Sequence, residues 1–195
     1  MSNFMLYDPE YEKKSSQLKC GGLLNRVGIV DLDTSEDEKW RHEQGWTHVL
    51  SVLDAETKHS DKRINVMDAD GVDLKSHFDD AANWIHARLT ENIINKVLVH
   101  CFAGISRSPS IVAAYMIKYH NYGASRALAT IKAYRSIIYP NNGFRQQLEE
   151  YAEEQVQKIL KPELQAKFGT SITRFFWTCV ARHDPQALLR ILSFL

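Results

Sequence analysis

The chain has 195 residues, a formal net charge of zero and a hydrophobic fraction of 44%. This length suits one domain with peripheral additions, and the apolar content suffices for a sizeable core. Because the 24 basic and 24 acidic side chains balance, no overall positive charge indicates nucleic acid or an anionic membrane as a partner. No apolar run approaches the roughly 20 residues that span a bilayer, so we expect no transmembrane segment.

Strand-like and helix-like segments alternate along the chain. Short apolar runs predict strands at Leu23–Val30, His48–Leu53, Ile64–Met67 and Lys96–His100. Helices are expected near Thr34-Ser35, from Asp73, from Pro109 to Gly123, from a cap at Ser125, and along the stripe Phe144, Leu148, Tyr151 and Ile159. The helix from Asp73 has one apolar stripe, formed by Leu74, Phe78, Ala81, Ile85 and Leu89. The alternation predicts an α/β fold with a central mixed, mostly parallel sheet flanked by helices.

The segment His100–Ser108 joins the fourth expected strand to a helix and contains a cysteine, five further residues and an arginine. A cysteine thiolate attacks phosphorus, and positive charge and helix N-terminal N–H groups favour the thiolate. Five residues are enough to curl the backbone so that its N–H groups surround an anion, and Gly104 permits the left-handed turn that this needs. Arg107 adds a bidentate fork that fits a phosphoryl group. The segment therefore predicts a phosphate cradle with Cys101 at its base.

Two other interpretations of Cys101 are weaker. A cysteine at the end of a strand is often an inert small hydrophobe, but the accompanying glycine and arginine have no place in that interpretation. In a cysteine protease His100 would be the base. Adjacent residues of a strand point to opposite faces, so His100 is badly placed to deprotonate Cys101.

Breaking a phosphate ester also needs a general acid, because the leaving oxygen must be protonated. The candidates lie between Met67 and Asp73, which includes three aspartates. Asp73 is better explained as the cap of the following helix. Spacing alone leaves both Asp68 and Asp70 open.

His100–Ser108 resembles the signature loop of the cysteine-dependent protein tyrosine phosphatase superfamily, and Ala103–Ser108 is particularly similar to the dual-specificity phosphatases. Tyr139–Phe144, with Gln147-Leu148, resembles that family's Pro-Asn-x-Gly-Phe-x-x-Gln-Leu stretch, and Asp68–Phe78 resembles its acid loop and helix. The similarity covers about residues 22–160. It implies a protein tyrosine phosphatase-like fold of the dual-specificity type. It also implies an N-terminal extension over 1–21, a catalytic domain over 22–160 and a C-terminal helical extension over 161–195.

The resemblance also implies roles for individual residues. Cys101 is the nucleophile that forms a phosphocysteine, Arg107 holds the phosphoryl oxygens, and Ser108 stabilises the thiolate as it leaves in the second step. Asp68, ten residues before Phe78, takes the place of the family's acid, with Asp70 as the fallback. Two residues, His100 and Asn141, have supporting roles. Five loop residues bind phosphate mainly through their backbone N–H groups: Phe102, Ala103, Gly104, Ile105 and Ser106.

The expected activity is that of a small, atypical dual-specificity protein phosphatase, which hydrolyses phosphotyrosine and phosphoserine or phosphothreonine without a cofactor. No segment resembles the loop that deepens the pocket of tyrosine-only phosphatases. Phe102 and Ile105 occupy positions where phosphoinositide-directed relatives tend to have lysines. Two alternatives remain: a phosphatase of a phospholipid or an RNA 5′ phosphate, and a phosphate-binding pseudo-phosphatase scaffold.

The sequence says less about metals, the cellular compartment and partners. The histidines have no ligand-like spacing, so we expect no metal. Cys20, Cys101 and Cys179 lack close pairing, which favours a reducing compartment, the cytoplasm or nucleus. We expect a phosphoprotein substrate as partner. Residues 161–195 carry apolar helical faces and a local excess of basic side chains, and they predict either extra core helices or a contact with a partner or membrane surface.

Overall fold

The computed structural model describes Leu18 and residues 22–159 of the chain. Its sheet has four strands, β1 (Val27–Val30), β2 (His48–Val52), β3 (Lys62–Ile64) and β4 (Val97–His100), in the order β1-β4-β2-β3. Every pair of neighbouring strands is parallel. This confirms the α/β class with a parallel sheet. The extension expected at 161–195 lies outside the described residues, as do Cys20, Cys179 and, apart from Leu18, the extension expected at 1–21.

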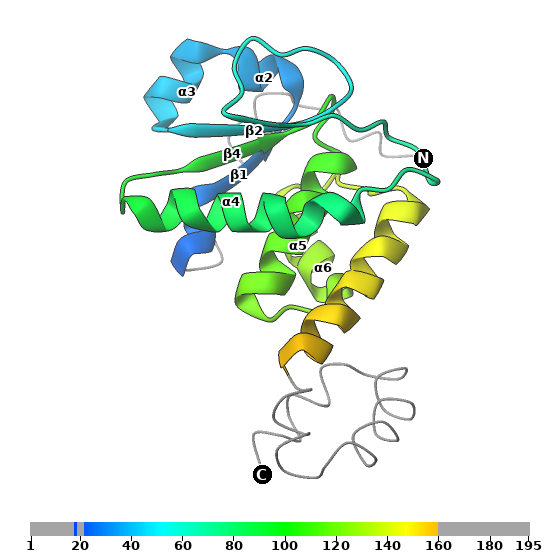
Figure 1. Ribbon diagram of the computed structural model, residues 1–195. Helices are drawn as coiled ribbons and strands as arrows, with labels where there is room; N and C mark the ends of the chain where they lie inside the picture. Colours follow the sequence, from blue (N-terminus) through cyan, green and yellow to red (C-terminus); the bar gives the residue numbers. More distant parts are fainter. Residues whose placement is uncertain (1–17, 19–21, 160–195) are drawn as a thin grey trace, which may run out of the picture.

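Helices cover both faces of the sheet (Figure 1). The short helices α2 (Leu32–Glu36) and α3 (Glu38–Gln44) lie on one face. The other face carries α4 (Phe78–Glu91), α5 (Arg107–His120), α6 (Ala124–Tyr134) and a last helix over 142–159. Parallel strands need such crossover connections, which cover both faces of the sheet, and the central strand β4 is accordingly buried along its whole length.

Alternate residues of the central strands supply the two sides of the core. Val97 and Val99 of β4 belong to the large apolar cluster that includes Tyr115 of α5. Leu98, between them, packs in a second cluster with Val30 and Trp46. The strand period of two residues accounts for this division.

The strand predictions were correct in number and order but wrong at some boundaries. Residues Gly22–Arg26 form a 3-10 helix, so β1 begins at Val27 and not at Leu23. β3 covers Lys62–Ile64 instead of Ile64–Met67. Beyond this strand the Val66 carbonyl accepts a hydrogen bond from Arg107 at 3.0 Å, a side-chain contact and not a strand pairing.

The predicted stripe is confirmed, since all five of its apolar side chains are buried. The predicted start of the helix was wrong, because α4 begins at Phe78, after a 3-10 turn over Lys75–His77, and Leu74 precedes both. Asp73 accepts a hydrogen bond from the Ser76 backbone N–H at 3.0 Å, as expected of a cap for the turn that leads into this helix. Other predicted helix ends were wrong. Asn121, in the left-handed region with φ 55°, ends α5 in place of Gly123. Gly123 instead precedes α6, where Ser125 donates to Glu149 and does not cap.

The first helical segment also begins earlier than predicted. The Asp31 carboxylate accepts from the Thr34 N–H at 2.8 Å and caps α2, which starts at Leu32. A second aspartate, Asp37, caps α3 in the same way. None of the helices in the described part is long and apolar enough to cross a bilayer.

Candidate active site

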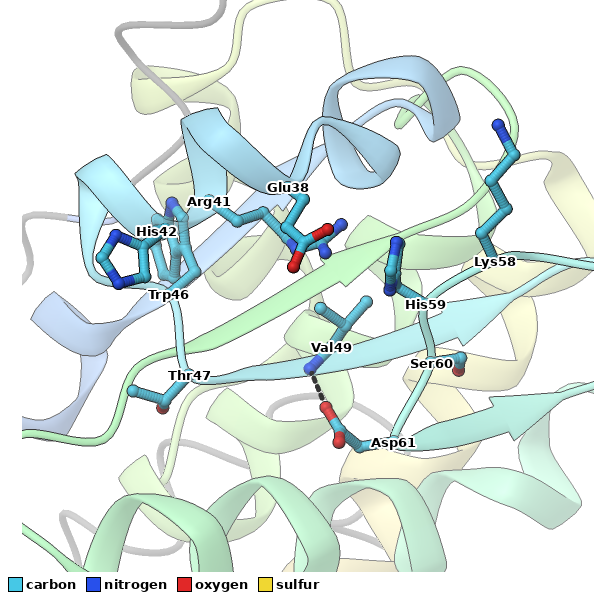
Figure 2. Close-up of a pocket in the computed structure, with 10 residues that line it drawn as sticks. All are labelled: Glu38, Arg41, His42, Trp46, Thr47, Val49, Lys58, His59, Ser60 and Asp61. Carbon is cyan, nitrogen blue, oxygen red and sulfur yellow. Dashed lines mark hydrogen bonds between the residues drawn. The ribbon is translucent and has the colours of Figure 1, made fainter.

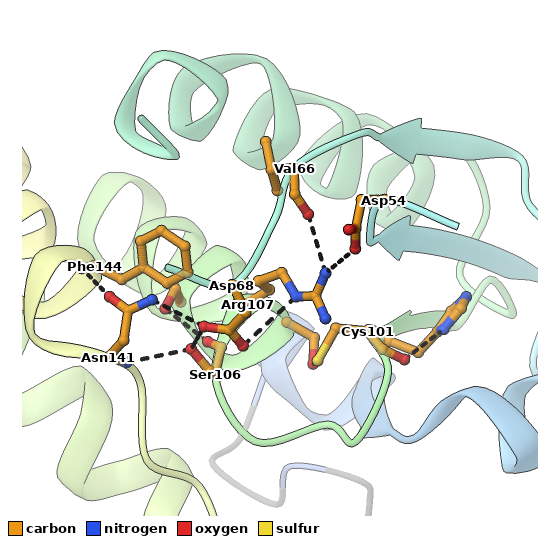
Figure 3. A network of polar contacts seen from close by, with 11 residues as sticks. Asp54, Val66, Asp68, Cys101, Ser106, Arg107, Asn141 and Phe144 are labelled. Atoms are coloured by element: carbon orange, nitrogen blue, oxygen red, sulfur yellow. Dashed lines mark hydrogen bonds and ion pairs between the residues drawn. The ribbon is translucent and has the colours of Figure 1, made fainter. Parts of the chain in front are cut away.

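The predicted cradle lies at the carboxyl end of β4, the strand between β1 and β2. The loop over 101–106 leaves this strand, and α5 begins at Arg107. Figure 3 shows Cys101, Ser106 and Arg107 around this loop, with Asp68 and Asn141 approaching from two other segments. Ligands of parallel α/β sheets bind beyond the carboxyl ends of the strands, so this position suits a binding site.

All six backbone carbonyls from Cys101 to Ser106 accept a hydrogen bond from outside the loop. In chain order the donors are His100 Nδ1 at 3.1 Å, Leu32 N at 3.0 Å, Arg135 Nη2 at 3.1 Å, Arg135 Nε at 3.0 Å, Tyr139 N at 2.8 Å and Ser110 N at 3.2 Å. In a trans peptide unit the N–H points away from the preceding carbonyl. Because the carbonyls are held outward, the N–H groups of residues 102–107 are directed inward. Inward N–H groups of this kind are the arrangement of an anion nest, and the binding of an anion here stays a prediction.

Gly104 is required by this geometry. Its φ is +67°, in the left-handed region, and an added Cβ would lie 2.6 Å from the Val30 carbonyl oxygen and 2.8 Å from Arg135 Nη2. An alanine here would face both an unfavourable backbone conformation and a collision with main chain. The loop therefore depends on glycine at this position, as predicted.

The Cys101 thiol lies at the base of the cradle and is 2% exposed. Ser108 Oγ donates a hydrogen bond to Cys101 Sγ over 3.3 Å. This hydroxyl is fully buried in the first turn of α5. The structure thus brings together the thiol and the hydroxyl that the sequence analysis paired.

His100 is fully buried, and its ring bridges two neighbours. Nδ1 lies 3.1 Å from the Cys101 carbonyl oxygen, and Nε2 lies 2.6 Å from Ser51 Oγ. A carbonyl oxygen can only accept, so Nδ1 carries the hydrogen and Nε2 of the neutral ring accepts from the serine. Burial lowers the pKa of His100, which also favours the neutral ring. These contacts orient the loop and leave the ring no free nitrogen for proton transfer.

The Arg107 guanidinium is 8% exposed and is held on one edge. Nη1 donates to Asp54 Oδ1 at 2.9 Å and to the Val66 carbonyl at 3.0 Å. Nε lies 3.6 Å from Asp68 Oδ2, and it is a buried donor with no hydrogen-bond partner in the described part of the chain. A buried unpartnered donor costs about 1–3 kcal/mol, which a bound acceptor would recover. A phosphoryl oxygen is such an acceptor.

The two acid candidates occupy different places. Asp68 Oδ1 accepts from Ser106 Oγ at 2.7 Å and from Asn141 Nδ2 at 2.9 Å, beside the cradle (Figure 3). Asp70 is exposed, and its carboxylate faces the Gly143 backbone N–H at 3.4 Å. Geometry therefore separates what spacing alone left open, because only Asp68 contacts residues of the loop.

Asn141 connects the acid loop to the cradle. Its side-chain amide donates to Asp68, and its carbonyl oxygen accepts from the Phe144 N–H at 2.8 Å, which caps the last helix. Its own backbone N–H donates to Ser106 Oγ at 3.2 Å. The asparagine therefore contacts both the acid loop and the cradle, as its expected supporting role requires.

Sequence reasoning missed three residues of this site. Asp54 follows β2, the neighbour of β4, and strands of a parallel sheet end at the same edge, so this carboxylate could have been found from topology. Ser51, on the same strand, could have been found in the same way as a partner of His100. Arg135 is buried after α6 and holds two cradle carbonyls, but nothing in its sequence surroundings indicates this.

A separate hollow of about 410 Å³ lies between α3 and the connection from β2 to β3 (Figure 2). Its lining includes Arg41, His42 and Trp46 on one side and Lys58 and His59 on the other. No cradle residue lines it. Within residues 22–159, no group of three or more histidine, cysteine or acidic side chains is arranged to hold a metal ion.

The chain belongs to the family of dual-specificity phosphatase catalytic domains, whose model matches residues 32–154. This confirms the family that the loop and its flanking motifs resemble. The chain is 41% identical over 128 residues to dual specificity protein phosphatase 15 of the mouse, a match that covers 63% of this chain and 53% of the relative. It is 39% identical over 141 residues to the zebrafish dual specificity protein phosphatase 22-A, a match that covers 70% of this chain and 66% of the relative.

Solved structures agree with the family. The crystal structure of DUSP15 superimposes on this chain with a TM-score of 0.64 at 34% identity, covering 77% of this chain and 97% of that one. The chain thus spans almost all of that solved domain, but only about half the length of the mouse relative.

Proposed function

We propose that this chain is a dual-specificity protein phosphatase, which hydrolyses phosphotyrosine and phosphoserine or phosphothreonine through a phosphocysteine. The observation that carries the proposal is the outward bonding of six successive carbonyls, which directs six N–H groups into a loop with a thiol at its base. Backbone dipoles fixed in this way stabilise an oxyanion without reorganising during the reaction. The names of the similar proteins support a protein substrate over a lipid or an RNA.

In the first step, the Cys101 thiolate would attack phosphorus and form the S–P bond, and the bond from phosphorus to the ester oxygen would break. The inward N–H groups and Arg107 would hold the phosphoryl oxygens through a loose transition state. Asp68 would give its proton to the leaving oxygen. Its Oδ1 accepts hydrogen bonds from Ser106 and Asn141, so Oδ2, which accepts none and lies 3.6 Å from Arg107 Nε, is the oxygen left to carry that proton.

In the second step, water would attack the phosphocysteine, and the sulfur would leave as a thiolate. Ser108 Oγ, 3.3 Å from the sulfur, would donate to the charge that develops there. Asp68, now ionised, would accept the proton of the attacking water. The reaction needs no cofactor, and a reduced thiol at Cys101 favours the cytoplasm or nucleus as the compartment.

The nucleophile gives the direct test of this proposal. Cys101→Ser should abolish hydrolysis of para-nitrophenyl phosphate but keep binding of tungstate, because the N–H groups and Arg107 remain. Arg107→Lys should also be severe, since a point charge cannot replace the planar fork. The measurements are turnover and tungstate affinity by calorimetry. Near wild-type turnover in Cys101→Ser would contradict the proposal, and a panel of phosphopeptides, phosphoinositides and triphosphorylated RNA would test the substrate class.

A further inference from the structure

Asp54 is an acidic residue placed unexpectedly at an anion-binding site. It lies just beyond β2, with its side chain 51% exposed, and its Oδ1 is 2.9 Å from Arg107 Nη1 (Figure 3). The pKa of Asp54 is lowered by its own backbone N–H and by Arg107, so it is ionised at neutral pH. A second negative charge beside a phosphoryl dianion weakens the attraction for that dianion. Any benefit from Asp54 must therefore come from geometry.

The geometry concerns which edge of the guanidinium is occupied. Nη1 is the terminal nitrogen on the Cδ side, and its two hydrogens are both used, by Asp54 and by the Val66 carbonyl. The opposite edge carries the Nε–H and the nearer N–H of Nη2, which are parallel. This edge is the fork that binds a phosphate in bidentate fashion. Among the described residues Nε has no hydrogen-bond partner; Asp68 Oδ2 lies 3.6 Å from it, too far for a hydrogen bond, so the N–H groups of the fork are left for a phosphoryl group.

We propose that Asp54 is a positioning residue for the reaction. Its carboxylate accepts a hydrogen bond from Arg107 Nη1 and so orients the guanidinium with its Nε/Nη2 edge toward the cradle. The carboxylate and the Val66 carbonyl together fix the rotation of the guanidinium plane. The Val66 carbonyl alone would give one hydrogen bond, about which the guanidinium plane could rotate. The catalytic part of this inference rests on the proposed phosphatase function, and the geometric part does not.

The test uses the full chain and three variants. Asp54→Ala removes the acceptor for Arg107 Nη1, and Asp54→Asn keeps an acceptor oxygen without the charge. Glu56→Ala removes an exposed carboxylate two residues further along the same connection. With para-nitrophenyl phosphate, Asp54→Ala should lower kcat by about 10- to 100-fold, the range expected for a misplaced catalytic group. Asp54→Asn should restore kcat to within about threefold of wild type, and Glu56→Ala should leave it unchanged.

Three outcomes would overturn the proposal: unchanged kcat in Asp54→Ala, an equal loss in Asp54→Asn, or an equal loss in Glu56→Ala. A purely structural role for Asp54 would lower the melting temperature along with kcat. The half-exposed carboxylate leads us to expect unchanged melting, measured on the same samples.

A double-mutant cycle asks whether Asp54 acts through Arg107, and it needs no catalysis. Tungstate affinity is measured for wild type, Asp54→Ala, Arg107→Lys and the double variant. Each single change should weaken tungstate binding. In the Arg107→Lys background, which lacks the fork, Asp54→Ala should weaken binding by less than about a further twofold. Additive losses would overturn the proposal. If wild type binds tungstate without hydrolysing phosphate esters, the proposed function fails while this cycle still decides the role of Asp54.

Discussion

Ser108→Ala should separate the two halves of the reaction. The substitution removes the hydroxyl that donates to Cys101 Sγ over 3.3 Å. It leaves the carbonyl contacts of the cradle in place, because Ser108 contributes to none of them. Attack by the sulfur should therefore be little affected. Departure of the sulfur as a thiolate should be slow, so the phosphocysteine should accumulate.

The size of the effect follows from the bond that is lost. A hydrogen bond to a charged group contributes about 1.5–3 kcal/mol. Since about 1.4 kcal/mol corresponds to a tenfold change in rate, breakdown of the phosphocysteine should slow by about 10- to 150-fold. The loss should appear in kcat, and KM should fall with it, because an intermediate that accumulates lowers both.

Rapid-quench kinetics with para-nitrophenyl phosphate would measure this directly. Ser108→Ala should release about one equivalent of nitrophenol in a burst and then turn over slowly, with phosphate bound covalently to the chain. Ser110→Ala is the matched control. Ser110 is equally buried in the same helix, but its hydroxyl donates to the Ser106 carbonyl and not to the sulfur. Wild-type steady-state turnover without a burst in Ser108→Ala, or the same burst in Ser110→Ala, would refute the assigned role.

Two further predictions concern acids and bases. Asp68→Asn should lower turnover of an alkyl phosphate by about 10²- to 10⁴-fold and of an activated aryl phosphate much less, while Asp70→Asn should have little effect on either; the reverse order would transfer the role to Asp70. Burial lowers the pKa of His86, His100 and His120 below the unfolded value of 6.5, so the unfolded chain binds more protons and stability falls as pH drops below that value. Each histidine contributes up to about 1.4 kcal/mol per pH unit to the slope, to be measured by urea unfolding between about pH 7.5 and 5.5, and a flat profile would contradict this.

The layout of the cradle was predictable because its chemistry is local in sequence. Cys101, Gly104 and Arg107 are close neighbours on the chain, and each has a narrow chemical use there. The α4 stripe was predictable for a similar reason, since a helical period survives in the residue order. Both predictions depend on short separations.

The residues that were missed act over long separations. Arg135 reaches the Gly104 carbonyl from 31 residues away, and Asp54 reaches Arg107 from 53 residues away. No local pattern distinguishes a buried arginine that serves a loop from one on a solvated helix. The ends of elements were missed because tertiary contacts decide them: β3 stops where the chain turns to Arg107, and Asn121 takes the left-handed position that was expected of glycine.

The outward bonding of the cradle carbonyls has a consequence for folding. The donors come from Leu32, from β4, from the first turn of α5, from Arg135 and from Tyr139. A peptide covering residues 97–120 would contain the nucleophile and every inward N–H group, yet it would lack four of the six donors that hold those groups in place, which come from Leu32, Arg135 and Tyr139. The proposed affinity for an oxyanion should thus require the assembled domain, and it should appear only late in folding, after segments more than a hundred residues apart have met.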